Sequence, residues 1–245
     1  MKDRTIFAPL VMAFDLLRSR TALLVFAAFL VVAVVSRPLM VTLMSDPLTL
    51  GVIDIRLVGF AVSLLLAGFS QYMIGRNLLL PGAQLGNVPW VKWIGLIVAI
   101  FVVKGVVGFI LATMLVMSSQ SDFALTYGSM ATGCVATILT FPLVVRALLA
   151  VAGIQSPKLG DIADVSFNGL RTNYFWFAVV ALVFPLLMVF AFTSLSGWGY
   201  DANAMQGNVL QSAITSLGQV LEMLLALVAA RSLVALSGDQ AETFA

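Results

Sequence analysis

The chain has 245 residues, of which 61% are hydrophobic and only 10% are charged, and its net charge is +2. An average soluble domain is about one-quarter charged, so this composition excludes an ordinary soluble domain and indicates a multi-span membrane protein. The small net charge gives no support for nucleic-acid binding. With one cysteine and no histidine, a disulfide framework, a cysteine-rich metal site and histidine-based catalysis are also excluded, and we expect no cofactor.

Six apolar stretches are long enough to cross a bilayer, because a helical span needs about 20 residues. They cover residues 21–43, 52–74, 94–117, 124–145, 174–195 and 209–236. These stretches leave no room for a soluble catalytic domain, so we predict a single integral membrane domain over 1–245, an all-α bundle of six transmembrane helices. Pro142 and Pro185 lie inside two of the stretches and are expected to bend or break their helices.

Two further segments have the pattern of helices that lie in the headgroup layer. In the first, 4–20, apolar residues recur at helical spacing: Ile6, Phe7, Leu10, Val11, Phe14 and Leu17. The second is the connector 156–172, which begins at Ser156-Pro157, a favourable start for a helix. We therefore predict two cytoplasmic amphipathic interfacial helices beside the six spans.

The basic residues are distributed unevenly between the two sides of the predicted bundle. Ten of the thirteen precede the first span, flank the connections between spans 2 and 3 and between spans 4 and 5, or lie near the C-terminus. Only Arg37 and Arg56 lie on the other side, and Lys104 lies within the membrane. Because Lys and Arg are enriched in cytoplasmic loops, both termini are predicted to be cytoplasmic. The short loops and this bias favour a bacterial inner (plasma) membrane.

Several diffuse features of the chain point to a known group of proteins. They are the length, the Phe-rich N-terminal amphipathic helix, the Phe141-Pro142-Leu143 segment in span 4 and a connector that ends in Leu170-Arg171-Thr172-Asn173. In these features the chain resembles a bacterial family of mostly uncharacterised six-span membrane proteins. Relatives of that family occur as the membrane domain of some glycerophosphodiester phosphodiesterases. The phosphodiesterase domain is not in this sequence, so the resemblance implies the fold and not that activity.

Two charged residues lie deep in predicted spans. Lys104 interrupts 94–117, and Glu222 lies in the middle of 209–236. A lone charge near the bilayer centre costs roughly 2.5–3.5 kcal/mol, so such a residue usually faces a partner or a water-filled cavity. Residues spaced four, four and three apart share one face of a helix, and here they form a polar stripe: Gln211, Thr215, Gln219 and Glu222. Lys104 and this stripe are the candidate site.

The candidate site has two interpretations. Lys104 and Glu222 either form a buried pair that holds spans 3 and 6 together, or they line a cavity that binds a charged solute or carries protons. Gly105 and Gly108 lie beside Lys104 and are expected to let a neighbouring backbone approach the charge.

Three classes of function are compatible with these features. The first is a non-catalytic membrane protein that acts through other membrane proteins or self-association, as an accessory, scaffold or assembly subunit. In it, Tyr174–Phe177 is either a headgroup-level anchor or a lipid-facing docking surface for another membrane protein. The second is a small transporter or lipid-handling protein with a cavity lined by Lys104, Glu222 and the polar stripe. The third is an intramembrane enzyme in which Lys104 activates Ser63 or Ser216. No oxyanion-hole motif accompanies that dyad, so we predict that the protein is not an enzyme and that it works with the lipid bilayer and membrane partners.

Overall fold

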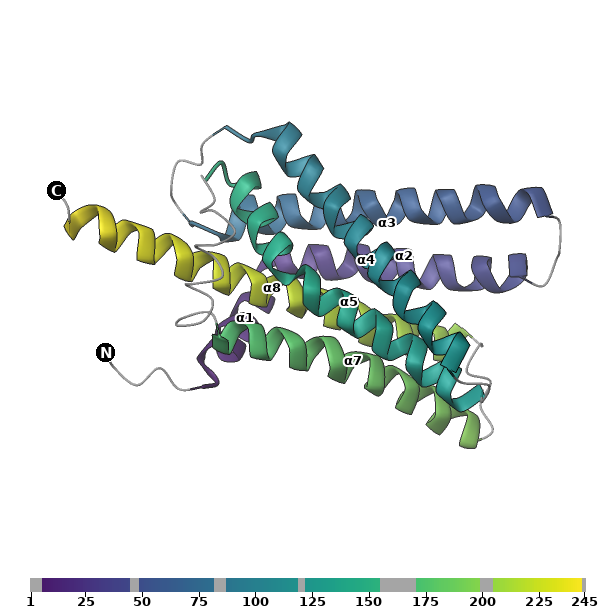
Figure 1. Ribbon diagram of the computed structural model, residues 1–245. Coiled ribbons are helices and arrows are strands. Elements are labelled where there is room, and N and C mark those ends of the chain that lie inside the picture. The colour runs from purple at the N-terminus through teal and green to yellow at the C-terminus, as the bar shows by residue number, and fades with distance from the viewer. Residues whose placement is uncertain are drawn as a thin grey trace.

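A computed structural model of the protein describes residues 6–44, 49–81, 87–118, 122–154, 171–198 and 205–243. Seven helices and no strand are found in these ranges: α1 (Ala8–Leu17), α2 (Arg20–Met44), α3 (Thr49–Leu78), α4 (Trp90–Ser118), α5 (Asp122–Val151), α7 (Arg171–Gly197) and α8 (Met205–Thr243). The long helices alternate in direction, so α1, the end of α3 and the end of α8 lie at one end of the bundle (Figure 1). The prediction of an all-α fold is confirmed for the described residues.

The membrane class is also confirmed. Four of the described helices contain segments long and apolar enough to cross a membrane: Trp90–Leu115, Ala131–Val151, Thr172–Ser194 and Gly207–Ala235. A fifth is added if α1 and the first part of α2, which meet at 79°, are taken as one broken span. The predicted span 52–74 lies within α3 and stays a prediction, as does the total of six. The predicted connector 156–172 lies outside the described residues except for its last two, which begin α7.

The N-terminal helix is shorter than the predicted 4–20. Pro9 occupies the first turn of α1, where its missing N–H removes no helical hydrogen bond. Ser19 marks the start of α2, since its Oγ accepts a hydrogen bond from the backbone N–H of Ala22 at 3.2 Å. α1 packs against α8 and α7 and leaves large apolar side chains exposed: Ile6, Phe7, Val11 and Phe14.

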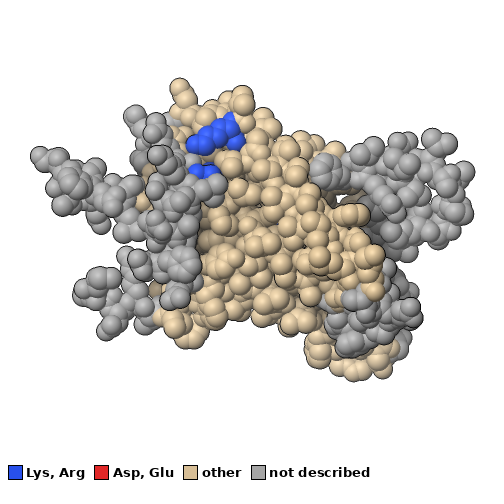
Figure 2. Space-filling view, viewed as in Figure 1, with Lys and Arg blue, Asp and Glu red and all other residues tan. Residues whose placement is uncertain are grey.

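The centre of the bundle is formed by α5 and α8, and its outside by α4 and α7. In an apolar stretch of 18 residues within each spanning segment, 61% of the residues are buried in α5 and in α8, but only 11% in α4 and 17% in α7. On the face shown in Figure 2, the visible basic side chains gather near the end of α3 and the start of α4. The rest of the described surface on that face carries neither basic nor acidic side chains. Such an uncharged surface suits helices that lipid surrounds.

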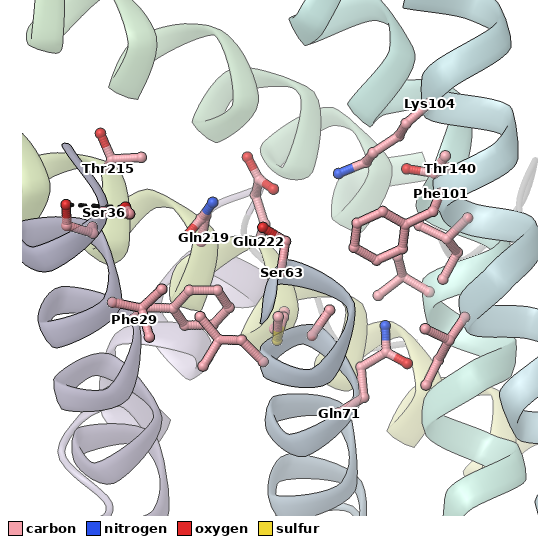
Figure 3. Close-up of a pocket in the computed structure, with 18 of the residues that line it drawn as sticks. Phe29, Ser36, Ser63, Gln71, Phe101, Lys104, Thr140, Thr215, Gln219 and Glu222 are labelled. Carbon is pink, nitrogen blue, oxygen red and sulfur yellow. Dashed lines mark hydrogen bonds between the residues drawn. The ribbon is translucent and has the colours of Figure 1, made fainter. Parts of the chain in front are cut away.

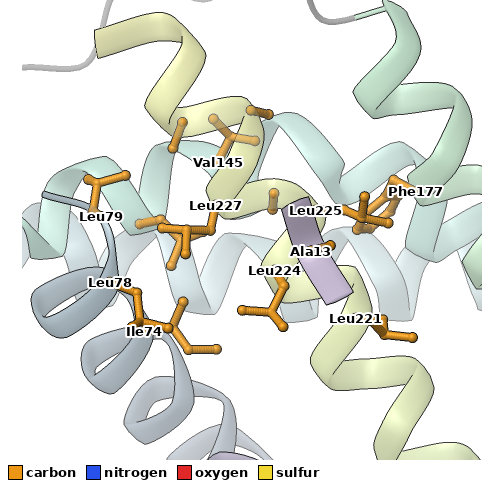
Figure 4. Packing of buried hydrophobic residues seen from close by; sticks show 14 of the residues in the cluster. Ala13, Ile74, Leu78, Leu79, Val145, Phe177, Leu221, Leu224, Leu225 and Leu227 are labelled. Carbon is orange, nitrogen blue, oxygen red and sulfur yellow. The ribbon is translucent and has the colours of Figure 1, made fainter. Parts of the chain in front are cut away.

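The apolar core lies in the half of the bundle nearer to α1. Leucines of α8 meet side chains of α1, α2, α3, α5 and α7 there, some of which are drawn in Figure 4. The residues at this meeting point include Leu221, Leu224, Leu225 and Leu227 of α8 with Ala13, Ile74, Leu79, Val145 and Phe177. Arg231 joins α8 to the end of α3, because its guanidinium donates to the backbone oxygens of Leu78 and Leu79. A helix C-terminus has unpaired carbonyls and a partial negative charge, so a cation there is favourable.

Neither proline breaks its helix, since α5 and α7 continue through Pro142 and Pro185. A proline inside a helix leaves the carbonyl four residues earlier without its helical donor. For Pro185 that carbonyl belongs to Ala181, and the thiol of Cys134 on α5 donates to it, with an Sγ-to-oxygen distance of 3.1 Å. Cys134 therefore replaces the missing donor and joins α5 to α7, a contact that the sequence did not indicate.

The close helix approach lies at Gly75 and not beside Lys104. A Cβ added at Gly75 would lie 2.2 Å from Cγ1 of Val151 and 3.2 Å from the backbone oxygen of Leu148, so α3 and α5 touch there. A Cβ added at Gly105 or Gly108 would meet no described atom within 4 Å. The expectation that these two glycines admit a neighbouring backbone is therefore wrong.

Gly75→Val is expected to destabilise the protein, because the Leu148 backbone cannot move aside as a side chain can. Overpacking of this kind typically costs about 1–3 kcal/mol. The matched control is Gly105→Val, which adds the same side chain to α4 in open space. The thermal unfolding midpoint of the purified chain in detergent should fall for Gly75→Val and stay near the wild-type value for Gly105→Val. Equal shifts in the two variants would contradict the close packing of α3 on α5.

Candidate functional site

A cavity of about 330 Å³ lies where the apolar core ends, and it is lined by residues of α2, α3, α4, α5, α7 and α8 (Figure 3). Along α3 it is lined from Ser63 to Gln71, whereas the buried core of this helix begins at Ile74. Along α8 it is lined from Thr215 to Met223, and the core continues from there toward the C-terminus. The cavity thus occupies the middle of the helices, at the depth where the bilayer centre is expected.

Opposite charges face this cavity from two helices. Lys104 reaches it from α4 and Glu222 from α8, and both side chains point into it in Figure 3. Both are half-buried. Among the described residues, neither a hydrogen bond nor an ion pair joins the two side chains. The structure therefore brings the two predicted residues to one space without fastening them to each other.

The cavity has an exposed mouth and a buried floor. Ser36, Ser63 and Gln219 are exposed lining residues and mark the mouth. Thr140 and Phe177 are at most 1% exposed and mark the floor. One part of a bound ligand can therefore be buried at the floor while another part stays accessible at the mouth.

The four hydroxyl groups in the lining all donate to a backbone carbonyl of their own helix. The pairs are Ser36 to Ala33 (3.3 Å), Ser63 to Gly59 (2.8 Å), Thr140 to Thr137 (2.8 Å) and Thr215 to Gln211 (2.9 Å). Each hydroxyl has a single proton, so what it can still offer to the cavity is oxygen lone pairs. These side chains therefore act toward a ligand as hydrogen-bond acceptors.

Gln71 adds a buried amide to the lining of the cavity. Its side chain is only 3% exposed, and its Oε1 has no hydrogen-bond partner in the described part of the structure. An unpaired buried carbonyl costs about 1–3 kcal/mol of stability. Buried polar atoms are nearly always paired in folded proteins, so each exception needs a reason. A ligand in the cavity that donates a hydrogen bond to Oε1 would be such a reason.

Four of the five predicted site residues line the cavity: Lys104, Glu222, Gln219 and Thr215. Gln211, one turn earlier on α8, is buried and lies outside the lining. Gln71 is not among the predicted site residues, although an amide inside the predicted span 52–74 is a signal for it. Polar residues near the end of a span are common, so that signal was weak.

The two serines of the enzymatic interpretation differ in their relation to Lys104. Ser63 lines the same cavity as Lys104, whereas Ser216 does not. The Ser63 hydroxyl donates to the Gly59 carbonyl of its own helix at 2.8 Å. Within the described ranges, no group of three or more acidic, cysteine or histidine side chains could hold a metal ion.

The aromatic run Tyr174–Phe177 does not form one lipid-facing surface. Phe177 is 1% exposed and lines the cavity floor. The Trp176 indole donates to the backbone oxygen of Ile6 at 2.8 Å, and its ring centroid lies 5.2 Å from that of Phe7. Trp176 therefore attaches the start of α1 to α7, so only part of the run is free to meet lipid.

The chemistry of the cavity is the basis for a functional assignment, since relatives of known activity do not supply one. Comparison of the chain with protein-family models, with curated proteins and with solved structures finds no match in any of the three.

Proposed function

We propose that the protein binds a small polar molecule, or the polar part of a lipid, within the bilayer and acts as a transporter or lipid-handling protein. The observation that carries this proposal is the cavity into which Lys104 and Glu222 both point without pairing. If the two charges served only to fasten α4 to α8, they would be expected in direct contact, because unpaired charges in a membrane are costly. A ligand that contacts both offsets that cost.

The membrane arrangement that accompanies this proposal has six spans, with α3 as the second. α1 then lies in the headgroup layer, where its exposed Phe7, Val11 and Phe14 meet acyl chains. The end of the bundle with the basic residues faces the cytoplasm of a bacterial inner membrane, as the positive-inside distribution predicts. The resemblance to the six-span family stays a prediction.

A purely partner-based role is less well supported by the surface. The exposed apolar side chains of α4 and α7 belong to helices that can span a membrane, so lipid contact accounts for them. The polar cavity has no such explanation. It is the more specific feature of the protein, and the binding role follows from it.

Blocking the cavity tests the proposal without changing a charge. Ala67 lines the cavity on α3, and Ala67→Phe should fill much of the 330 Å³ and abolish ligand retention. Ala61, on the same helix, is exposed and outside the lining, so Ala61→Phe is the matched control. The measurement is native mass spectrometry of the full chain after mild extraction. The wild type and Ala61→Phe should retain a common small molecule or lipid in stoichiometric amount, and Ala67→Phe should not.

Thermal unfolding of all three proteins shows whether Ala67→Phe still folds. If it folds and all three proteins carry only the same non-stoichiometric bulk lipid, the binding role is wrong. A membrane protein that co-purifies with all three, in place of any retained ligand, would instead support the accessory role.

A further inference from the structure

The walls of the cavity differ in the hydrogen-bonding groups that they offer. Acceptors come from several helices: the hydroxyl oxygens of Ser36, Ser63, Thr140 and Thr215, Oε1 of Gln71 and the carboxylate of Glu222. Lys104 enters from α4 and offers an ammonium group, which is a donor with no acceptor. The amides of Gln71 and Gln219 add N–H donors as well as carbonyl oxygens. The lining therefore has many acceptors and its cationic group on one side.

We infer that the ligand is a zwitterion that carries an ammonium group and a carboxylate or phosphate group. The inference rests on the proposed binding role. The ammonium group is held by Glu222 and donates to hydroxyl oxygens of the lining, whose single protons are already donated to backbone carbonyls. The anionic group is held by Lys104. A simple anion would meet the Glu222 carboxylate, and a simple cation would meet the Lys104 ammonium, so each single charge is disfavoured on one side.

The size and the apolar lining limit what this zwitterion can be. A volume of about 330 Å³ equals the share of roughly eleven liquid water molecules, which is enough for a headgroup or a small amino-acid-like molecule but not for a whole lipid. Phe29, Phe101 and Phe177 contribute aromatic surface that suits methylene groups and an ammonium group. Two sources share this chemistry, a free small zwitterion and the headgroup of phosphatidylethanolamine. In the second case the acyl chains leave through the mouth at Ser36 and Ser63.

Stabilisation by matched probes tests the inference, because a ligand that binds only the folded state raises its thermal unfolding midpoint. Phosphoethanolamine carries both charges, ethanolamine only the cationic one and glycerol phosphate only the anionic one. The purified full chain should bind phosphoethanolamine at least roughly tenfold more tightly than either single-charge probe, as expected when a charged hydrogen bond is lost. A second arm compares phosphatidylethanolamine with phosphatidylglycerol in nanodiscs. If phosphatidylethanolamine binds more tightly than phosphoethanolamine, the zwitterion is the headgroup of that lipid and not a free small molecule.

Two variants give opposite signatures. Lys104→Met should lose the preference for phosphoethanolamine over ethanolamine, and Glu222→Gln should lose the preference over glycerol phosphate. Lys92→Met, on the same helix but outside the lining, should keep both preferences.

Two results would overturn the zwitterion. One is a single-charge probe that binds the wild type as tightly as phosphoethanolamine. The other is the lack of a saturable shift with every probe and with both lipids. In either case the retention experiment with Ala67→Phe decides separately whether the cavity binds a ligand at all.

Discussion

Lys104→Met and Glu222→Gln are each expected to fold at the wild-type level and to lose the cellular function, and the double variant is expected not to regain it. The reason is that the two side chains face the same cavity without a hydrogen bond or ion pair between them in the described structure. Each variant then removes one anchor for the ligand and leaves the packing of α4 and α8 unchanged. Removal of a charge from mid-membrane also relieves an insertion cost of roughly 2.5–3.5 kcal/mol, so the yield should not fall.

The measurements are the monodisperse yield after size-exclusion chromatography and complementation of a strain that lacks the protein. Lys104→Arg keeps the charge and should retain part of the function, and Lys92→Met should retain all of it. The opposite pattern, in which each single change lowers the yield and the double change restores it, would show a coupled structural pair. That outcome would contradict the binding role and would show that Lys104 and Glu222 form a buried pair that holds α4 and α8 together.

The elements that sequence alone could predict are those set by a single helix and the bilayer. The thickness of the membrane fixes the length of a span, so the segments of α4, α5, α7 and α8 were found by hydropathy. The helical repeat fixes which side chains share a face, so Thr215, Gln219 and Glu222 were grouped before any neighbour was known. Lys104 stood out because a charge in an apolar span is costly wherever it points.

The contacts that sequence alone could not predict depend on which helices are neighbours. Gly75 and Gly105 are both glycines in apolar helices, yet only Gly75 touches another backbone. Gln71 looked like an ordinary residue near the end of a span until α5 and α7 placed Thr140 and Phe177 beside it in the same cavity. Hydropathy describes the distance of a residue from the membrane surface and says nothing about the order of helices around the bundle.

Gln71→Met is expected to make the protein more stable and less active at the same time. Methionine has a similar length and fills the same volume, but it removes an amide whose Oε1 is buried without a partner. The unpaired carbonyl costs about 1–3 kcal/mol, and each kcal/mol corresponds to roughly 2–4 °C in the unfolding midpoint of a chain of this size. The ligand-free variant should therefore unfold several degrees higher than the wild type, and its ligand retention should fall by roughly tenfold or more.

Gln211→Met is the matched control, because Gln211 is comparably buried, at 5% exposure, but lies outside the cavity lining. It should keep the ligand and gain no stability. An apolar residue in place of Gln71 would cost the fold no stability. A residue that lowers stability and is needed for binding therefore serves the ligand and not the fold. If Gln71→Met instead lowered the unfolding midpoint and left ligand retention unchanged, Gln71 would be part of the packing, and the floor of the cavity would have no role in recognition.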